Sequence, residues 1–357
     1  MRLFLISNMF PSNTDPLFGI FVQNFKIELE KQGIVFSKTV LIKGKAQTPL
    51  KKIIKYCIHY IKIVLRFFSY KYDLIYIHYL THHIPILIFL TPFMFKPLVV
   101  NVHGSDIMEL QNKNVLNYFA KIILKKVDLI VVPTSYFKEL IMDKYSFIDS
   151  NKIFISPSGG IDSDKFYPKP IVSNKSILTL GFVSRFIEEK GWRTFLDALI
   201  LIKKKGISFR AIIVGKGPDK EKILQYITHN NLKKEIDFKG LIQQEYLVDI
   251  YNNLNLYIFP TYREAESLGL TGLEAMSCGV PVIGCNIAGP STYIKDEFNG
   301  YFFTLKDSTS LYNNILKYYN LSQKQKAQLS LNALKTAEAY NKEIVAEKLI
   351  ARLQDIL

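Results

Sequence analysis

The chain has 357 residues, of which 48% are hydrophobic and 22% charged, and its formal net charge is +15. This length predicts two α/β domains of similar size, and the mixed composition with three scattered cysteines excludes disordered, collagen-like, coiled-coil and disulfide-framework classes. The positive charge favours an anionic membrane or a phosphorylated substrate over nucleic acid, because aromatic residues do not interleave with the basic clusters.

In the first half, strand-like runs alternate with amphipathic segments, which is typical of a parallel sheet built from βαβ units. The predicted strands are 3–7, 35–41, 74–78, 98–103, 129–133 and 153–156, and the predicted helices are 20–31, 50–68, 115–126 and 135–144. The N-terminal residues resemble a first strand and not a secretory segment. The longest apolar run, 84–95, is broken by Pro85 and Pro92 and is shorter than the roughly 20 residues of a spanning helix. We therefore expect a cytoplasmic protein.

Turn residues at 157–160 and 168–170 interrupt this rhythm, and a second series then begins. Its predicted strands are 177–183, 209–215, 236–238, 256–260 and 281–284, with a clear helix at 192–204. The sequence thus predicts two doubly wound domains, residues 1–168 and 169–357, with the last helix packed back on the first domain. Ligands of open parallel sheets bind at the carboxyl ends of the strands, so the residues just after each strand are the candidates for chemistry.

The predicted helix 50–68 has an unusual distribution of charge. Between Glu30 and Asp73 the chain has ten basic residues and no acidic one. One helical face carries Leu50, Ile53, Ile54, Cys57, Ile58, Ile61, Leu65 and Phe68, and the other carries Lys51, Lys52, Lys55, His59, Lys62 and Arg66. The apolar face could pack on the sheet as core. The one-sided charge favours instead a membrane and acceptor side formed by the five cations, with an anionic leaflet as partner.

Two further cations, Arg185 and Lys190, lie between a predicted strand and the helix at 192–204. A cation at a helix N-terminus opposes the macrodipole, so this placement favours an anion between the two side chains. The alternative is a solvated loop that holds two of the many basic residues.

The most informative segment is 260–283, where a strand, a loop and a helix follow one another. Gly269 permits close approach of the backbone to a ligand. Glu266 and Glu274 are eight positions apart, about 12 Å along a helix at ~1.5 Å per residue, which is about the reach from the sugar to the ribose of a nucleotide sugar. The alternative is that Glu266 caps the helix and Glu274 is an ordinary surface residue.

The stretch from Glu266 through Glu274 to Ile283 resembles the signature of the family 4 retaining glycosyltransferases, the group 1 enzymes of GT-B fold. Further segments match in the same order, namely the Gly19 loop with Phe21-Val22, then 102–106, 185–191, 214–218 and 238–240. The resemblance implies two Rossmann-like domains whose parallel sheets face a central cleft. The first would be the acceptor side, and the second would bind the nucleotide sugar.

The resemblance also implies roles for individual residues. Glu266 would hold hydroxyls of the donor sugar and Glu274 the ribose, while Arg185 and Lys190 would neutralise the diphosphate. Backbone amides of Leu268, Gly269, Leu270 and Thr271 would bind the diphosphate or sugar. Gly19 would let the first domain approach the phosphates, and His103 would lie over the donor sugar.

The implied function is retaining transfer from a nucleotide sugar to a saccharide acceptor, without cofactor or metal. We expect a lipid-linked acceptor, a role in cell-surface polysaccharide or lipopolysaccharide biosynthesis, and a peripheral location on the inner face of the cytoplasmic membrane. Many members of the family have a Gly-Gly-x-x-Glu stretch at the position of residues 288–292. This chain has a threonine in place of the glutamate, so the motif does not identify the nucleotide or the sugar of the donor.

Several other patterns carry less weight. Asp162-Ser163-Asp164 is similar to a metal-binding Asp-x-Asp but lies in the predicted linker, and 215–217 begins like a dinucleotide fingerprint that Lys220 breaks. We expect His59, His78, His82 and His83 at the surface or in a second layer. The open alternatives are a nucleotide-sugar epimerase or a phosphorylase of the same architecture, and a non-catalytic sugar-binding protein.

Overall fold

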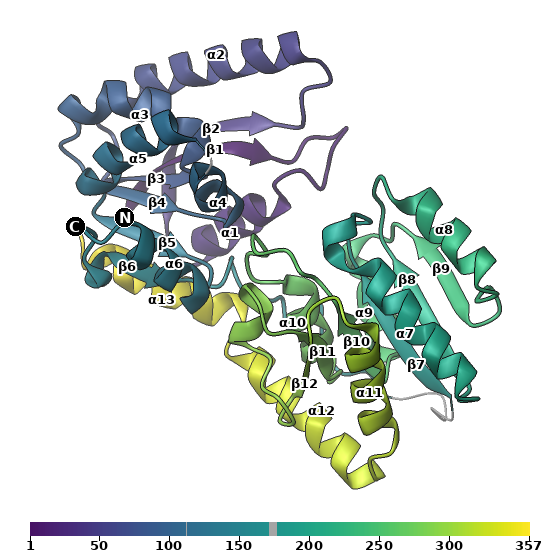
Figure 1. The fold of residues 1–357 in the computed structure, drawn as a ribbon. Coiled ribbons are helices and arrows are strands. Elements are labelled where there is room, and N and C mark those ends of the chain that lie inside the picture. Colours follow the sequence, from purple (N-terminus) through teal and green to yellow (C-terminus); the bar gives the residue numbers. More distant parts are fainter. Residues whose placement is uncertain (112, 171–176) are drawn as a thin grey trace. The chain divides into compact units, whose positions relative to one another are not determined.

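The computed structural model describes residues 1–111, 113–170 and 177–357. The chain divides into two compact units, which are described separately (Figure 1). Unit 1 comprises Met1–Gly160 and Lys342–Leu357, and unit 2 comprises Ile161–Asn341. Each unit contains one six-stranded sheet in which all strands are parallel, and the prediction of two Rossmann-like α/β folds is confirmed.

In unit 1 the strand order is β2-β1-β3-β4-β5-β6. The strands are β1 (Arg2–Phe10), β2 (Val35–Lys43), β3 (Leu74–His78), β4 (Leu98–Asn101), β5 (Leu129–Val132) and β6 (Ile153–Ile155). The chain moves from β1 to β2 on one side and then continues from β3 on the other side. The order therefore reverses between β1 and β3, and a ligand crevice is expected at the carboxyl ends of these strands.

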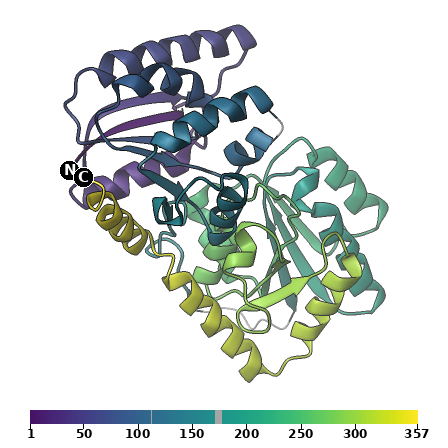
Figure 2. The same ribbon diagram turned by 60° about the vertical axis from the view of Figure 1, so that its left-hand side comes forward.

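Helices cover both faces of this sheet. They are α1 (Ile20–Lys31), α2 (Pro49–Phe67), α3 (Ile84–Leu90), α4 (Ser105–Gln111), α5 (Asn114–Lys126), α6 (Ser135–Lys144) and α13 (Lys342–Gln354), with short 3₁₀ turns η1 (Thr81–His83), η2 (Thr91–Phe93) and η3 (Ser150–Lys152). One core joins α2, α3, α5 and α6 to the sheet, and the other joins α1 and α13. Helix α13 packs beside α1, which brings the two ends of the chain close together (Figure 2).

In unit 2 the strand order is β12-β11-β10-β7-β8-β9. The strands are β7 (Leu178–Val183), β8 (Phe209–Val214), β9 (Ile236–Gly240), β10 (Leu256–Phe259), β11 (Val282–Cys285) and β12 (Gly300–Phe303). The helices are α7 (Trp192–Lys204), α8 (Lys220–His229), α9 (Leu247–Asn252), α10 (Leu270–Ser277), α11 (Ser308–Tyr319) and α12 (Gln323–Glu338), with η4 (Glu188–Lys190), η5 (Gln244–Tyr246) and η6 (Gly289–Thr292). Here the order reverses between β7 and β10, so the loops after these two strands mark the expected crevice.

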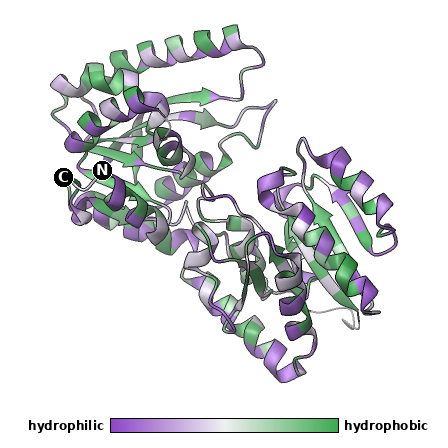
Figure 3. Ribbon diagram, in the orientation of Figure 1, coloured by the Kyte–Doolittle hydropathy of each residue, from purple (hydrophilic) through white to green (hydrophobic). Residues whose placement is uncertain are grey.

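Helix α2 packs differently from the usual amphipathic helix of such a domain. Its buried residues are His59, Ile63 and Phe67. The predicted apolar face is turned to solvent instead, with Ile61 59% and Leu65 70% exposed. The interpretation of this face as core is therefore wrong, and His59, predicted on the polar face, lies inside. Figure 3 shows the alternating hydrophobic and hydrophilic bands of α2.

Among the described residues, no helix is both long and apolar enough to cross a membrane.

The two glycines that flank α1 allow a test of backbone packing. Gly19 and Gly33 both have left-handed backbone, with φ of 73° and 85°. A Cβ on Gly19 would lie 2.6 Å from the carbonyl carbon of Met9, whereas a Cβ on Gly33 would meet nothing within 4 Å. We expect Gly33→Ala to lower the free energy of unfolding by roughly 1–2 kcal/mol and Gly19→Ala by about 1–3 kcal/mol more, as measured by urea denaturation. Equal losses would contradict the contact between Gly19 and the end of β1.

Candidate active site

A partly buried ion pair lies at the strand-order reversal of unit 2. The ammonium group of Lys190, at the end of η4, pairs with the carboxylate of Glu266, in the loop after β10, and both side chains are only 13% exposed. Removing two charges from water is costly, so each group depends on the other as its counter-ion. In the free chain the counter-ion of Lys190 is thus a carboxylate of the chain itself, and its predicted contact with a ligand anion stays a prediction.

The backbone around this ion pair is held by close loop contacts. Gly191 caps α7 with left-handed backbone, and a Cβ there would lie 1.9 Å from the Pro260 carbonyl oxygen. The Tyr262 amide donates to the Glu189 carbonyl at 3.0 Å. The Thr261 hydroxyl lies 3.3 Å from the same carbonyl and 3.5 Å from the Glu266 carboxylate. A glycine at position 191 is therefore required to bring the loop after β7 against the end of β10.

Arg185 lies in the loop after β7 and is exposed. Within the described parts of the chain, no hydrogen bond or ion pair joins its guanidinium to Lys190 or Glu266. Lys190 and Glu266 thus contact each other, and the predicted contact of Arg185 with an anion stays a prediction.

Helix α10 begins with a glycine that leaves its N-terminus open. Gly269 is the N-cap residue, with φ of 79°, and it makes no side-chain cap hydrogen bond. A Cβ on it would lie 2.4 Å from the Phe259 ring. The interpretation of Glu266 as the helix cap is therefore wrong. Since α10 starts at Leu270, the separation of about 12 Å along a helix does not apply to Glu266 and Glu274.

The residues before and after Gly269 are fixed by packing. Leu268 is 1% exposed, and a Cβ on Gly289 would lie 2.5 Å from its Cα atom, so the loop after β11 lies against it. On the other side, the Tyr257 hydroxyl lies 2.8 Å from the Thr271 hydroxyl. The amides from Leu268 to Thr271 are thus held in a rigid turn.

Glu274 lies on α10 and is 4% exposed, so it is not an ordinary surface residue. The Gln244 side-chain amide donates to Glu274 Oε1 at 2.9 Å, and the Tyr251 hydroxyl donates to Glu274 Oε2 at 2.8 Å. Burial raises the pKa of this carboxyl group, and the two hydrogen bonds partly oppose the shift. Gln244 and Tyr251 were missed by the sequence analysis, because neither lies in a recognisable motif.

In unit 1, His103 follows β4 and is buried. Its Nε2 atom lies 2.9 Å from Nδ1 of His78, and its ring stacks on Tyr79 with centroids 4.6 Å apart. The His103 backbone amide donates to Asp106 Oδ1 at 2.9 Å. Burial lowers the pKa of His103 to about 3, so its ring is neutral at physiological pH.

Of the four histidines expected at the surface or in a second layer, two form a second buried pair. His59 and His83 are 3% and 0% exposed, and their Nε2 atoms lie 3.0 Å apart. His78 is also buried, whereas His82 is half-buried. The described residues contain no cluster of three or more His, Cys, Asp or Glu side chains that could hold a metal ion.

Comparison with known proteins agrees with this arrangement. Residues 26–164 match the protein family described as "Glycosyltransferase Family 4", and residues 163–336 match the family described as "Glycosyl transferases group 1". The 2-deoxystreptamine N-acetyl-D-glucosaminyltransferase of Niallia circulans is 27% identical over 245 residues, which are 64% of this chain and 62% of that protein. The chain spans between 60% and 63% of the length of the first curated relatives that it matches.

Solved structures share the fold over the whole chain. Sucrose-phosphate synthase from Thermosynechococcus elongatus has a TM-score of 0.80 at 19% identity and covers 100% of this chain and 99% of its own. HepE from Anabaena in complex with UDP has a TM-score of 0.74 at 17% identity, with 99% and 100% coverage. At these identities the likeness establishes the GT-B fold alone.

The buried carboxyl group of Glu274 predicts a particular pH dependence. A carboxyl whose pKa is raised by folding contributes stability below its ordinary value of 4.5, and this contribution is lost as the pH rises through the folded-state value. We expect Glu274→Gln, which stays neutral, to gain stability relative to the wild type between pH 4 and pH 7 in urea unfolding. The control is Glu264→Gln at an exposed position. Parallel pH curves for the wild type and Glu274→Gln would contradict the buried charge.

Proposed function

Because this chain belongs to the family 4 glycosyltransferases, we propose that it is a retaining, metal-independent enzyme that transfers a sugar from a nucleotide sugar to a saccharide acceptor. The observation that carries this proposal is the partly buried ion pair of Lys190 and Glu266 at the strand-order reversal of unit 2. A ligand can separate the pair only if it supplies both a negative group and hydroxyl donors. The diphosphate and the sugar of a nucleotide sugar supply them together.

The donor is bound by unit 2 in this proposal. Lys190 exchanges Glu266 for the diphosphate, and Glu266 accepts hydrogen bonds from the sugar hydroxyls. Glu274, held by Tyr251 and Gln244, has lone pairs left for the ribose. The amides at the start of α10 complete the anion site, since no side chain caps them. HepE binds UDP, and uridine is therefore the first nucleotide to test.

The chemical step breaks the bond between the anomeric carbon and the diphosphate oxygen and forms a bond from this carbon to an acceptor oxygen. Negative charge develops on the leaving diphosphate, where Lys190, Arg185 and the α10 amides stabilise it without a metal. The acceptor oxygen attacks on the face from which the diphosphate leaves, and a phosphate oxygen takes its proton, so configuration is retained. Gly19 and the neutral His103 are the proposed contributions of unit 1 to the donor phosphates and sugar.

Helix α2 supports a lipid-linked acceptor and a peripheral location on an anionic membrane. Its solvent-facing apolar side chains would enter the interface, and the cations that flank them would meet anionic headgroups. Lys51, Lys52, Lys62 and Arg66 are exposed, and Lys55 is half-buried. Such an acceptor fits cell-surface polysaccharide or lipopolysaccharide biosynthesis.

The proposed roles of the two cations are tested by Lys190→Ala and Arg185→Ala. Each should cost roughly 2–4 kcal/mol in transition-state stabilisation, measured as kcat/KM for release of nucleoside diphosphate. Lys222→Ala, at a cation on α8 that is 66% exposed, is the matched control, and circular dichroism verifies folding. If both active-site variants turn over nearly as fast as the wild type, Lys190 and Arg185 take no part in the reaction.

Metal independence is tested by adding an excess of chelator to the transfer assay. Since side chains and amides form the proposed anion site, we expect the rate to be unchanged. Loss of activity that magnesium or manganese restores would refute this mechanism.

The proposed membrane face is tested by Ile61→Asp together with Leu65→Asp. Both side chains are already exposed, so the fold should tolerate the change, while cosedimentation with anionic vesicles should fall at least about tenfold. The control is Leu331→Asp, at an exposed position on α12. The peripheral location would be contradicted if vesicle binding does not change with these substitutions, with salt concentration or with lipid charge.

A further inference from the structure

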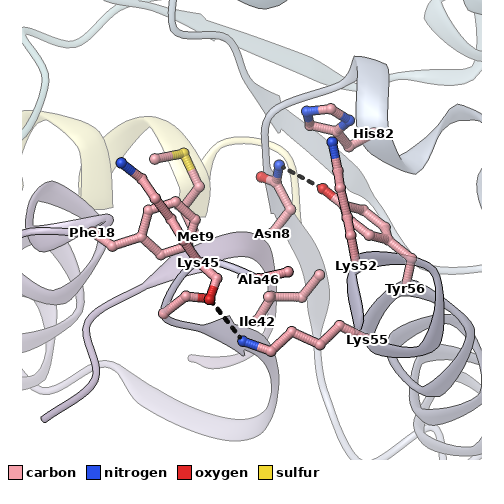
Figure 4. Close-up of a pocket in the computed structure, with 11 residues that line it drawn as sticks. Asn8, Met9, Phe18, Ile42, Lys45, Ala46, Lys52, Lys55, Tyr56 and His82 are labelled. Atoms are coloured by element: carbon pink, nitrogen blue, oxygen red, sulfur yellow. Dashed lines mark hydrogen bonds between the residues drawn. The ribbon is translucent and has the colours of Figure 1, made fainter. Parts of the chain in front are cut away.

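Unit 1 contains a pocket whose lining includes Lys52 and Lys55, two of the cations assigned above to the membrane side. Its volume is about 280 Å³, and it lies at the carboxyl ends of β1 and β2 beside the first turns of α2 (Figure 4). The pocket shares the carboxyl end of β1 with the crevice expected between β1 and β3, where the strand order of unit 1 reverses. The volume lies near the lower end of small-molecule sites and suits a headgroup better than a whole nucleotide sugar.

The lining of the pocket is basic. It includes Lys45, Lys52 and Lys55 but no carboxylate. The Lys55 ammonium donates to the carbonyls of Lys43 and Gly44, both at 3.0 Å, so it serves to hold the loop between β2 and α2. No carboxylate among the described residues forms an ion pair with the ammonium of Lys45 or Lys52. Two cations are therefore available to a ligand.

The nearby carboxylates do not neutralise the pocket. Asp15 accepts a hydrogen bond from the Lys45 backbone amide at 3.3 Å, and Glu109 pairs with Lys113 at 3.3 Å. Neither residue lines the pocket. An anion that enters between the two available ammonium groups would thus meet no fixed negative charge on the wall.

An uncharged hydrogen-bond acceptor, the side-chain oxygen of Asn8, is a second group that a ligand could contact. Asn8 is 5% exposed, and its side-chain nitrogen donates to the Tyr56 hydroxyl at 3.3 Å. The Asn8 side-chain oxygen is buried without a hydrogen-bond partner among the described residues. Such a group is costly to leave unsatisfied, so it favours a ligand that brings an O–H donor. Figure 4 shows Asn8 in the pocket between Lys45 and Lys52.

We infer that this pocket binds the phosphate-bearing headgroup of the acceptor, with the phosphate on Lys45 and Lys52 and a neighbouring hydroxyl on Asn8. The identity of the ligand as acceptor rests on the proposed function. Lys52, Lys55 and Tyr56 belong to the same helix whose other side exposes its apolar residues. A phosphate attached to a lipid in the membrane would therefore reach the pocket beside the surface that binds the lipid.

The probe is farnesyl monophosphate, titrated by calorimetry below its micellar concentration, with inorganic phosphate and farnesol in parallel. We expect Lys52→Gln and Asn8→Asp each to weaken farnesyl monophosphate binding at least about tenfold, because one removes a cation and the other adds a negative charge at nearly constant shape. Lys71→Gln, at an exposed cation of the same basic segment, is the control and should bind as the wild type does. Inorganic phosphate should bind more weakly but with the same dependence on Lys52, and farnesol should show none.

Equal binding of the phosphate probes by the wild type, Lys52→Gln, Asn8→Asp and Lys71→Gln would overturn the inference. Weaker binding by Lys190→Ala would also overturn it, because the probe would then occupy the donor site. Hydrolysis of UDP-glucose, measured as UDP release, distinguishes failure of this inference from failure of the proposed function. Lys71→Gln, which lies outside both proposed sites, should keep the rate of the wild type. If the wild type and every variant fail to consume any nucleotide sugar while the pocket binds phosphate as expected, the proposed function is wrong and the phosphate site stands.

Discussion

The partly buried ion pair of Lys190 and Glu266 constrains what unit 2 can bind. It joins the loops after β7 and β10, the neighbouring strands at which the order of the sheet reverses. Because both charges are mostly removed from water, neither can lose its partner without a replacement of similar strength. A neutral sugar would leave the ammonium unpaired, and a simple anion would leave the carboxylate unpaired. A nucleotide sugar would satisfy both groups, which is why we propose this class of ligand for the site.

Much of this architecture is visible in the sequence, because buried parallel strands are continuous apolar runs and their connecting helices are amphipathic. The motif around Glu266 also located the loop that bears the ion pair. The partners of Glu274 were not visible, since Gln244 and Tyr251 come from other elements and meet it only through tertiary packing. Strand β12 was also missed. The paired histidines were missed for the same reason as the partners of Glu274.

In helix α2 the sequence pattern identifies the apolar stripe correctly, but the interpretation that this stripe packs on the sheet is wrong. Periodicity finds the apolar stripe, but it does not say which side of the helix faces the sheet. In the structure a third face, centred on His59 and Ile63, packs inward, and the stripe remains in water. A soluble domain rarely leaves so long an apolar face uncovered without a binding role. The basic pocket at the start of the same helix is the site at which we propose that the phosphate of a lipid-linked acceptor binds.

The most direct test of this account is calorimetric titration of UDP into the wild type and Glu266→Gln. If Glu266 holds Lys190 until a diphosphate displaces it, the neutral glutamine removes both the competitor and a negative charge beside the phosphates. UDP, which lacks the sugar that Glu266 is proposed to hold, should then bind several-fold more tightly to the variant, while transfer from the complete donor slows. Unchanged or weaker UDP binding by Glu266→Gln would contradict the proposed exchange of ion-pair partners at the centre of the site.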